Sequence, residues 1–520
     1  MAGQTNSDGV KTTRPSDRFR LRSFIEQLSE IGEVEIIEKN VELIDIAPRL
    51  DGNPKAVLFR SVGPEGAELV GNVMGSRRRL AAAFGVGEQE LLATVMKRLE
   101  TPIAPIEVPQ TDAPVQDLVL TGDDADLTRL PIHLQHALDG GPYISAGIDI
   151  SLDVTGSRRN IGYRRLMMRG RKEAGIDLIA PSDMRVGYAS FVEKKQPMPV
   201  AFVIGSHPAD GIASVAMTPA QDEIALMGAL RSAPVPLVKC RTNDLMVPAD
   251  AEIVLEGFLD EHGWREAEGP YGEYLGYYGH VKMNPVFHLT AITMRRDALF
   301  QTATISGRAL GQTDTAQLVS LRTELTMWGA LQGAIREPLA VYCPGSTGGM
   351  HNVRVSMRQR YPGEVRNAIA SIFASKADVK HVFIVDEDVN IFSDEQMDWA
   401  LATRFQADRD LVIASGFRTI PLDPSLLGSN MGAKAGFDLT FPMGWQKNPA
   451  FSVPEAPTLA NVSKTSVVAA LQSGPKHFRE LMEATGSRDG RDTAVELDEI
   501  RSSGRLSRTP EGLYQLREGA

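Results

Sequence analysis

The amino-acid sequence predicts an α/β protein with a β-barrel or β-sandwich placed between two α/β domains. Three observations support this fold class. Helix-like and strand-like segments alternate up to about residue 100, strand-like segments dominate from 118 to about 310, and alternation returns from about 315. Alternation is typical of α/β units, whereas many short strands separated by Gly and Pro are typical of a barrel or sandwich. A chain of 520 residues is also too long for one hydrophobic core.

The first α/β domain is assigned to residues 19–117. Residues 1–18 are polar and lack the apolar core of a signal peptide, so we expect them to be disordered. From Leu21 the segment LRSFIEQLSEIG has helical spacing of its apolar residues, and the following VEIIE is typical of a strand. The Pro-rich segment 101–117 predicts a linker to the next domain.

The middle domain, residues 118–314, is rich in strand-like runs such as GIDISLDV, NIGYRRLMM, MPVAFVIG and EIVLEGFL. In residues 315–460, helices (AQLVSLRTELTMWGALQGA, VRNAIASIFASK) alternate with strands (LAVYCP, VKHVFIVDEDV), which predicts a largely parallel sheet. The last segment, 461–520, reads as two helices and a hairpin. That order is compatible with a winged-helix module, but the segment lacks a basic recognition face, which favours an oligomerisation or capping role.

The composition excludes several classes of protein. The net charge of −11, from 55 basic and 66 acidic residues, argues against a nucleic-acid partner, and we interpret Arg77–Arg79 as a solvated helix start. The two cysteines, Cys240 and Cys343, suit buried positions better than a disulfide framework or a metal site. No apolar stretch reaches the roughly 18–20 residues needed to span a bilayer. We therefore expect a cytoplasmic protein with no membrane partner.

The segment EGPYGE places Glu268 and Glu273 on either side of a Pro-Tyr-Gly turn. Two carboxylates that bracket a turn can face one cavity, where mutual repulsion and burial turn one of them into a general acid. The alternative is a solvated acidic turn.

The segment RRNIGYRRL is typical of a strand, so alternate side chains face opposite sides. Asn160, Gly162 and Arg164 are expected on one face, and Ile161, Tyr163 and Arg165 on the other. A buried arginine there would offer a fixed fork to a carboxylate. The alternative is a surface strand with solvated arginines.

Other motifs indicate less. VDEDVNIF, with Asp386 and Asp388, suits either a divalent cation or a polar strand end, and the second is favoured. His133 and His136 have the spacing of metal ligands on a helix but no evident third ligand. The sequence contains no G-x-G-x-x-G and no G-x-x-x-x-G-K-[ST], which removes the commonest dinucleotide and ATP signatures.

Taken together, these segments resemble the UbiD family of decarboxylases. The resemblance extends from about residue 22 to about 445 and rests on six segments in order: GNVMGSRRRLA, NIGYRRL, LVKCRTNDLMVPADAEIVLEG, EGPYGEYLGYYG, VDEDVNIF and ATRFQADRD. It implies an N-terminal α/β domain, a split β-barrel related to flavin reductases and a C-terminal α/β domain that forms a homodimer. The implied cofactor is prenylated FMN, supplied by a flavin prenyltransferase, which acts as an electron sink while CO₂ leaves.

The resemblance also implies roles for individual residues. Arg165 would hold the substrate carboxylate and the cofactor region, Glu268 would orient Arg165, and Glu273 would protonate the carbon after decarboxylation. Asn160, Ile161, Arg165 and Lys434 (in SNMGAKAGFDLT) would bind the cofactor. Its metal, Mn²⁺ or Mg²⁺ with K⁺ as a further candidate, would be held by Asn160 and Glu223. Asp183 stands where the family has a histidine ligand, and aspartate is a hard oxygen ligand acceptable to these cations.

The sequence thus predicts a reversible, non-oxidative carboxy-lyase acting on an aromatic, heteroaromatic or α,β-unsaturated acid. Two alternatives stay open at this point. One is an FMN-dependent oxidoreductase on a split barrel, which would not need the Arg165, Glu268 and Glu273 set. The other is a non-catalytic paralogous subunit of a decarboxylase complex, which the Asp183 departure favours and the retained acid–base residues disfavour.

Overall fold

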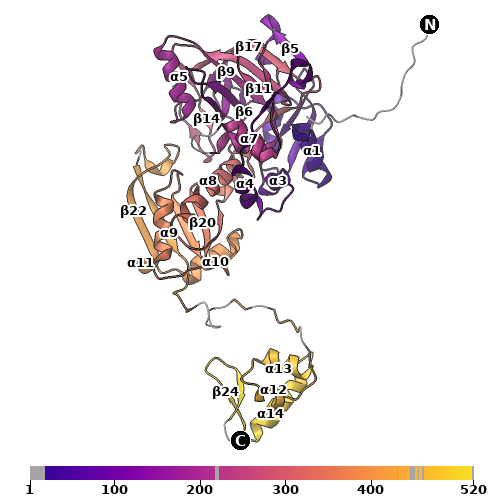
Figure 1. The fold of residues 1–520 in the computed structure, drawn as a ribbon, viewed down its shortest axis with the longest axis vertical. Helices are drawn as coiled ribbons and strands as arrows, with labels where there is room; N and C mark the ends of the chain where they lie inside the picture. The colour runs from indigo at the N-terminus through magenta and orange to yellow at the C-terminus, as the bar shows by residue number, and fades with distance from the viewer. Residues whose placement is uncertain are drawn as a thin grey trace, which may run out of the picture. The chain divides into compact units, whose positions relative to one another are not determined.

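The computed structural model describes residues 18–216, 222–429, 431–445, 451, 453–454, 456–459 and 462–517 (Figure 1). The chain forms two compact units, residues 1–440 and 441–520. The predicted disordered N-terminus lies outside the described residues except for Arg18.

The N-terminal domain is an α/β unit, as predicted. Its sheet has the order β1-β2-β3-β18, and β18 comes from residues that follow the barrel in the chain. Helix α1 buries Leu21, Phe24, Ile25 and Leu28, which accounts for the helical spacing seen in the sequence. The elements are α1 (Leu21–Glu30), β1 (Val34–Ile37), α2 (Ile46–Leu50), β2 (Ala56–Val62), β3 (Ala67–Gly71), α3 (Arg77–Ala82), α4 (Leu91–Leu99) and β18 (Phe300–Thr302).

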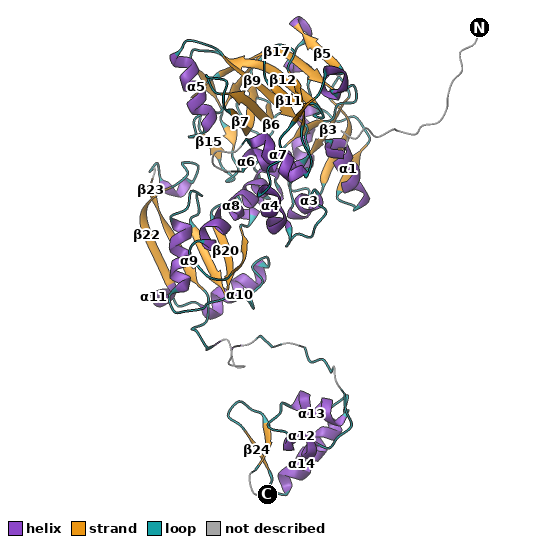
Figure 2. Ribbon diagram, viewed as in Figure 1, coloured by secondary structure: helices purple, strands orange, loops and turns teal. Residues whose placement is uncertain are grey.

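The middle domain is a closed antiparallel barrel (Figure 2), which confirms the predicted class. Its strand order is β12-β9-β6-β7-β8-β17, and β17 pairs back to β12. Side chains of β9 alternate between two apolar clusters, so this strand is buried on both faces and reads as the continuous run MPVAFVI. The strands are β6 (Tyr143–Leu152), β7 (Arg159–Met168), β8 (Glu173–Ile176), β9 (Met198–Ile204), β12 (Ile253–Leu259) and β17 (Val286–Met294), with β5 (Leu118–Thr121) beside β17.

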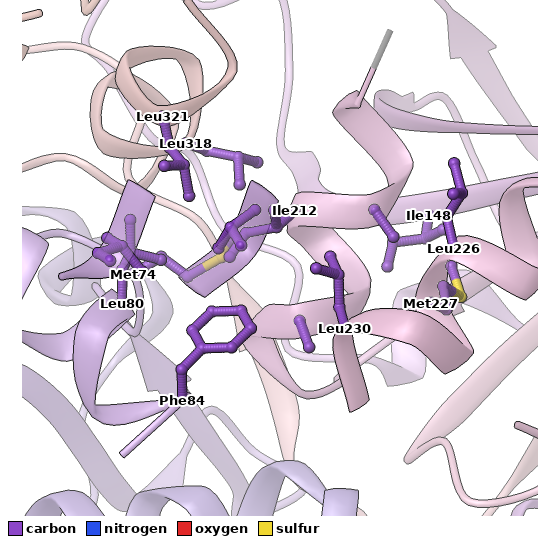
Figure 3. Packing of buried hydrophobic residues seen from close by; sticks show 14 of the residues in the cluster. Met74, Leu80, Phe84, Ile148, Ile212, Leu226, Met227, Leu230, Leu318 and Leu321 are labelled. Atoms are coloured by element: carbon purple, nitrogen blue, oxygen red, sulfur yellow. The ribbon is translucent and has the colours of Figure 1, made fainter. Parts of the chain in front are cut away.

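Two short helices join the domains of the first unit. Helices α6 (Pro208–Val215) and α7 (Glu223–Arg231) pack side chains such as Ile212 and Leu230 into one apolar cluster (Figure 3). The same cluster takes in Met74 and Phe84 of the N-terminal domain, Ile148 of β6, and Leu318 and Leu321 of α8 (Asp314–Gln332). The position of α7, and with it Glu223, is therefore fixed by packing against three parts of the chain.

The Pro-rich segment 101–117 is built into this unit rather than running free. Its strand β4 (Ile106–Glu107) pairs in parallel with β10 (Pro236–Lys239), which also pairs with β11 (Met246–Pro248). Proline lacks a backbone N–H, but the non-proline residues Ile106 and Val108 supply the donors that this short edge pairing needs.

The C-terminal domain contains a five-stranded sheet of order β19-β20-β21-β23-β22. Its central strands are parallel, but β19 and β22 at the edges are antiparallel to their neighbours, so the prediction of a largely parallel sheet holds only for the centre. A parallel neighbour needs a crossover such as helix α9, whereas strands joined without one pair antiparallel. The elements are β19 (Pro338–Tyr342), β20 (Asn352–Met357), α9 (Glu364–Phe373), β21 (His381–Val385), α10 (Asp394–Arg404), β22 (Leu411–Arg418) and β23 (Met431–Asp438).

The second unit has its own small core. It contains α12 (Val467–Gln472), α13 (Phe478–Thr485), α14 (Arg491–Ser502) and the hairpin β24 (Leu506–Arg508)–β25 (Tyr514–Leu516). The predicted helices and hairpin are confirmed, and α12 is an additional helix. Three helices followed by a hairpin is the order of a winged-helix module, and its role stays a prediction.

The structure corrects the interpretation of Arg77–Arg79 as a solvated helix start. Arg77 is buried and its Nη1 lies 2.8 Å from both carboxylate oxygens of Glu324 on α8, while Arg79 is fully buried against Glu33 and Pro54. Only Arg78 is solvated. Cys240 and Cys343 are buried free thiols, as predicted. No helix in the described ranges is long and apolar enough to cross a membrane.

Removing Glu324 is expected to destabilise the first unit. Glu324→Ala leaves the buried Arg77 guanidinium unpaired, which costs about 3 kcal/mol. The matched control is Glu387→Ala, which breaks the exposed pair with Arg358 and is expected to change the stability little. Urea unfolding of both variants measures the difference, and equal losses would contradict a structural role for the Arg77–Glu324 pair.

Candidate active site

The two glutamates of EGPYGE lie at the ends of a buried turn, residues 268–273, called here the acid turn. Glu268 ends β13 (Glu266–Glu268) and Glu273 follows β14 (Tyr271–Gly272). Between them the Gly269–Pro270 peptide is cis, and Gly269 has φ of +95°, a conformation that glycine adopts readily. Glu268 is 0% and Glu273 is 4% exposed. The alternative of a solvated acidic turn is therefore wrong.

Strand β7 presents its side chains as the alternation predicts. Asn160 and Arg164 both hydrogen-bond to Asp149 of β6, at 3.2 and 3.0 Å, which places them on one face. Arg165 belongs to the opposite face, and its side chain is only 12% exposed. The alternative of a surface strand with solvated arginines is excluded for Arg165.

Arg165 joins both glutamates. Its Nε donates to Glu268 Oε1 at 3.0 Å and its Nη2 to Glu268 Oε2 at 3.3 Å, while its Nη1 donates to Glu273 Oε1 at 2.8 Å. Its Nη2 also lies 3.0 Å from Asp177 Oδ2, and the guanidinium stacks 4.5 Å from the ring centre of Tyr271. Burial alone would lower the pKa of Arg165, but Glu273, Glu268 and Asp177 together raise it well above the usual value.

Three of the five guanidinium N–H groups donate in these hydrogen bonds, and the Asp177 contact is an ion pair. Nη1 makes one hydrogen bond to the described residues, so its second N–H is available to an added anion.

The two glutamates differ in how many hydrogen bonds their carboxylates accept. Glu268 also accepts hydrogen bonds from Tyr143 Oη at 3.0 Å and from Asn284 Nδ2 at 3.3 Å, so donors saturate both of its oxygens. Glu273 has only the Arg165 hydrogen bond on Oε1, and in the described part of the chain nothing hydrogen-bonds to its Oε2. The two carboxylates therefore differ in their surroundings, with donors on both oxygens of Glu268 and on one oxygen of Glu273.

A segment that precedes the barrel holds the acid turn in place. We call residues 135–140 the clamp segment. Asp139 Oδ1 accepts the Gly272 N–H at 2.9 Å, and the Gly140 N–H donates to the Pro270 carbonyl at 2.8 Å. A side chain at Gly140 would collide with the carbonyl of Gly269, so glycine is required for this close approach. The clamp fixes the backbone on both sides of Tyr271.

The two histidines singled out by the sequence do not form a metal site. His136 belongs to the clamp, with Nδ1 3.0 Å from Asp139 Oδ2. His133 is buried, and burial lowers its pKa to about 4. Asp388 and Glu387 of VDEDVNIF pair with Arg404 and Arg358, which supports the interpretation of that motif as a polar strand end.

Two of the three predicted metal ligands, Asn160 and Glu223, lie at the start of β7. Glu223 opens α7, and its Oε2 accepts the N–H of Ile161, the residue after Asn160, at 2.5 Å. Burial, with Asp149 and Asp183 nearby, raises the pKa of Glu223 to about 7. A half-buried carboxylate that makes no ion pair with the described residues is a donor that a hard cation would satisfy, so Asn160 and Glu223 fit a divalent metal.

Asp183 is placed differently. It opens α5 (Asp183–Glu193), and its carboxylate pairs with Arg158, with both side chains more than half exposed. Among the described residues, no three His, Cys, Asp or Glu side chains gather closely enough to hold a metal by themselves. Asp183 would have to leave Arg158 to become a ligand.

A flavin would need polar groups beside its ring. Several buried polar atoms have no hydrogen-bond partner among the described residues, and two of them belong to β7 and to the start of α8. They are the hydroxyl of Tyr163, on the same face of β7 as Arg165, and the hydroxyl of Thr315 at the start of α8. Buried polar atoms are nearly always satisfied, so these two fit a polar ligand lying between β7 and α8.

Lys434 does not join this set. It is buried in β23, its Nζ donates to the Phe373 carbonyl at 3.0 Å, and it lies 5.2 Å from the ring centre of Phe417. Its ammonium is thus engaged within the C-terminal domain, and its contact with the cofactor stays a prediction.

Several site residues were missed by sequence reasoning. Asp177, Lys282, Asn284, Tyr143 and Asp139 all touch the acid turn or Arg165, yet none lies in a recognisable motif. The only available signal was position, since Lys282 and Asn284 lie on β16 (Lys282–Asn284), the strand that pairs with β13.

Comparison with known proteins gives three consecutive matches to family models. They are the N-terminal domain of 3-octaprenyl-4-hydroxybenzoate carboxy-lyase over residues 25–99, its Rift-related domain over 106–309 and its C-terminal domain over 316–439. The matches end before the second compact unit begins.

Individual relatives match over nearly their whole length. The anhydromevalonate phosphate decarboxylase of Methanosarcina mazei is 31% identical over 423 residues, which is 81% of this chain and 95% of the relative. The UbiD-class enzyme HmfF from Pelotomaculum thermopropionicum, solved with FMN, is 33% identical with a TM-score of 0.79, over 84% of this chain and 97% of that one. An evolved dimeric form of HmfF, solved with prFMN, is 32% identical with a TM-score of 0.76, over the same shares.

The clamp is expected to control the geometry of the acid turn. The Asp139 carboxylate accepts hydrogen bonds from two backbone N–H groups. Asp139→Asn replaces one of its oxygens with an NH₂ group that cannot accept, which weakens the contact with Gly272. Because small displacements of reacting groups are costly, we expect the rate of the site's chemistry to fall about tenfold or more with little loss of thermal stability. Asp153→Asn, in an exposed turn, is the control. Equal rates for the two variants would contradict the clamp.

Glu223 is expected to weaken the metal-free protein as the pH rises. Since its pKa is raised from 4.5 to about 7, the folded chain holds a proton that the unfolded chain releases above pH 4.5. Stability from this group therefore declines between pH 4.5 and about 7 and then stays level. Glu223→Gln should raise the melting temperature at pH 8 by about 2 °C, with no gain near pH 4. Glu26→Gln, at an exposed position, should leave the melting temperature unchanged at both pH values. A higher melting temperature of Glu223→Gln at both pH values would contradict the assignment of the effect to ionisation of Glu223.

Proposed function

Because the chain belongs to the UbiD family of carboxy-lyases, we propose that it catalyses the reversible, non-oxidative decarboxylation of an aromatic, heteroaromatic or α,β-unsaturated acid with prenylated FMN. One observation carries the proposal. A buried arginine is held by two glutamates. Among the described residues, one glutamate accepts hydrogen bonds on both oxygens and the other on one, and one N–H of the arginine Nη1 has no acceptor. Hydride transfer would not need this arrangement, which disfavours the alternative of an FMN oxidoreductase.

Each protein group has a separate task. Arg165 would bind the substrate carboxylate through its remaining N–H, in a site where burial strengthens the charge-assisted hydrogen bond. Glu268 would keep the guanidinium in place and charged. After CO₂ leaves, Glu273 would give its proton to the carbon that carried the carboxylate, becoming a carboxylate itself. It would then regain a proton from solvent, so that the substrate carboxylate and one proton yield CO₂ and the decarboxylated product.

Prenylated FMN, when bound, supplies the sink for the electron pair left by the departing CO₂. The hydroxyls of Tyr163 and Thr315 support a ligand beside β7, and the prFMN complex of a relative 32% identical supports its identity. Asn160 and Glu223 would hold Mn²⁺ or Mg²⁺ next to Ile161, and Asp183 would join them only on leaving Arg158.

We also propose a cytoplasmic homodimer that receives its cofactor from a flavin prenyltransferase. Strand β22 supports the dimer, because it is an edge of the C-terminal sheet and carries Ile413, which is 67% exposed. An exposed apolar edge strand is a surface suited to pairing with a second copy. The dimeric form of the related HmfF points the same way.

Replacing Glu273 tests the proposal. The holoenzyme, co-expressed with a flavin prenyltransferase, is incubated with a panel of unsaturated and aromatic acids, and CO₂ release is measured. Glu273→Gln should lower CO₂ release about 10³-fold, because the carbon loses its proton donor, with an unchanged visible spectrum of the bound flavin.

Glu266→Gln is the matched control, since Glu266 lies two residues from Glu268 on the same strand with a side chain 47% exposed. Full activity of the Glu273 variant would overturn its assignment as the acid. Turnover of NAD(P)H without CO₂ release by the unmodified enzyme would overturn the reaction class.

A further inference from the structure

Two charged residues that no motif marks, Asp177 and Lys282, complete the surroundings of Arg165. Asp177 follows β8, and its Oδ2 lies 3.0 Å from Arg165 Nη2 and 3.1 Å from Lys282 Nζ. Lys282, on β16, also lies 3.8 Å from Glu273 Oε1. Arg165, Glu268, Glu273, Asp177 and Lys282 therefore form one charge cluster, and the side chain of Lys282 is the most exposed of them at 24%.

The cluster holds three carboxylates but two cations. In a buried site an unbalanced negative charge is costly, and the imbalance disappears when one carboxylate takes a proton. Glu268 has four donors, and Asp177 has Arg165 and Lys282, which lower its pKa against the effect of burial. Glu273 accepts the fewest hydrogen bonds of the three, and in the proposed function it carries that proton. Glu273 loses this balance at the moment it gives the proton away.

We propose that Lys282, held in position by Asp177, is a further positioning residue, whose ammonium offsets the negative charge that Glu273 acquires when it protonates the substrate carbon. The proposal rests on the proposed function of Glu273. Arg165 cannot do this alone, since it is shared among three carboxylates. Without Lys282, Glu273 would hold its proton more tightly and be a weaker acid.

The two members of the pair should act in opposite directions. Lys282→Met removes a positive charge near Glu273, so the high-pH limb of the kcat profile, where Glu273 is ionised, should move up by about one pH unit. The value of kcat below that limb should fall about tenfold, because a weaker acid gives its proton more slowly. Asp177→Asn removes a negative charge and should move the same limb down. Lys282→Arg should restore the limb of the unmodified enzyme.

A surface pair of the same type provides the control. Lys239 and Asp244 are ion-paired with side chains 57% and 91% exposed, and Lys239→Met and Asp244→Asn should leave the profile unchanged. The other groups around Glu273 are the same in all variants, so their titrations cancel in the comparison. They are Arg165 on β7, Glu268 on β13, Tyr143 on β6, Tyr271 on β14, Tyr274 beyond it, and His136 and Asp139 of the clamp segment.

A measurement without turnover separates this proposal from the proposed function. Glutamate labelled with ¹³C at Cδ is incorporated, the Glu273 signal is assigned by its loss in Glu273→Gln, and its midpoint is titrated by NMR in the protein without substrate. We expect the midpoint to rise in Lys282→Met and to fall in Asp177→Asn. If the midpoint shifts but no acid is decarboxylated, the proposed function fails and the charge coupling stands.

Midpoints and limbs that stay unchanged in both variants would overturn the role of Lys282, even in a fully active enzyme. If Lys282→Met does not fold, Lys282→Gln and Asp177→Asn carry the same comparison. Shifts of the same sign in the two variants would also overturn the proposal, because a merely structural disturbance has no reason to follow the sign of the removed charge.

Discussion

The burial of one guanidinium is the constraint on which the site depends. A charge taken out of water costs several kcal/mol unless partners surround it, and Arg165 is surrounded only when three separate segments arrive together. The acid turn contributes Glu268 and Glu273, and the end of β8 contributes Asp177, which directly follows that strand. Closure of the barrel fixes β7 between β6 and β8, so a slip of one residue would turn Arg165 toward Asp149 and leave the glutamates unpaired. Fold and site therefore stabilise each other.

The same arrangement keeps like charges close together. Two glutamates and an aspartate around one arginine repel each other, so the backbone must hold them against that repulsion. The clamp segment does so through Asp139 and Gly140, which bind the turn on both sides of Tyr271 without touching the reacting groups. In the proposed mechanism, a turn held this way would need little reorganisation when charge moves from the substrate to Glu273, which is the condition for electrostatic stabilisation of a transition state.

The sequence was sufficient for features that depend on local spacing. The period of two on β7 predicted which face carries Arg165, and the Gly and Pro of EGPYGE predicted the turn between the glutamates. It was not sufficient where distant segments decide the outcome. Asp139 and Asp177 look like any surface aspartate, because their partners lie on strands far along the chain. Arg77 reads as a solvated charge because Glu324 is 247 residues away. The edge strands of the C-terminal sheet are antiparallel because no crossover helix joins them to their neighbours, and the hydrophobic pattern does not encode how strands are connected.

Strand β7 also relates the two ends of the site to each other. Asn160 and Arg165 are five residues apart, which puts roughly 16 Å between their α-carbons in an extended strand. An odd separation sends their side chains to opposite faces, so a ligand that reaches both must pass the beginning of the strand, where Glu223 binds the Ile161 N–H. This geometry favours an elongated molecule with an anionic end near the cation that Asn160 and Glu223 would hold and with a reacting end near Arg165. It also separates the anion from the charge cluster of Arg165, Asp177 and Lys282. A phosphate bound directly to that cluster would compete with the substrate carboxylate for the one free N–H.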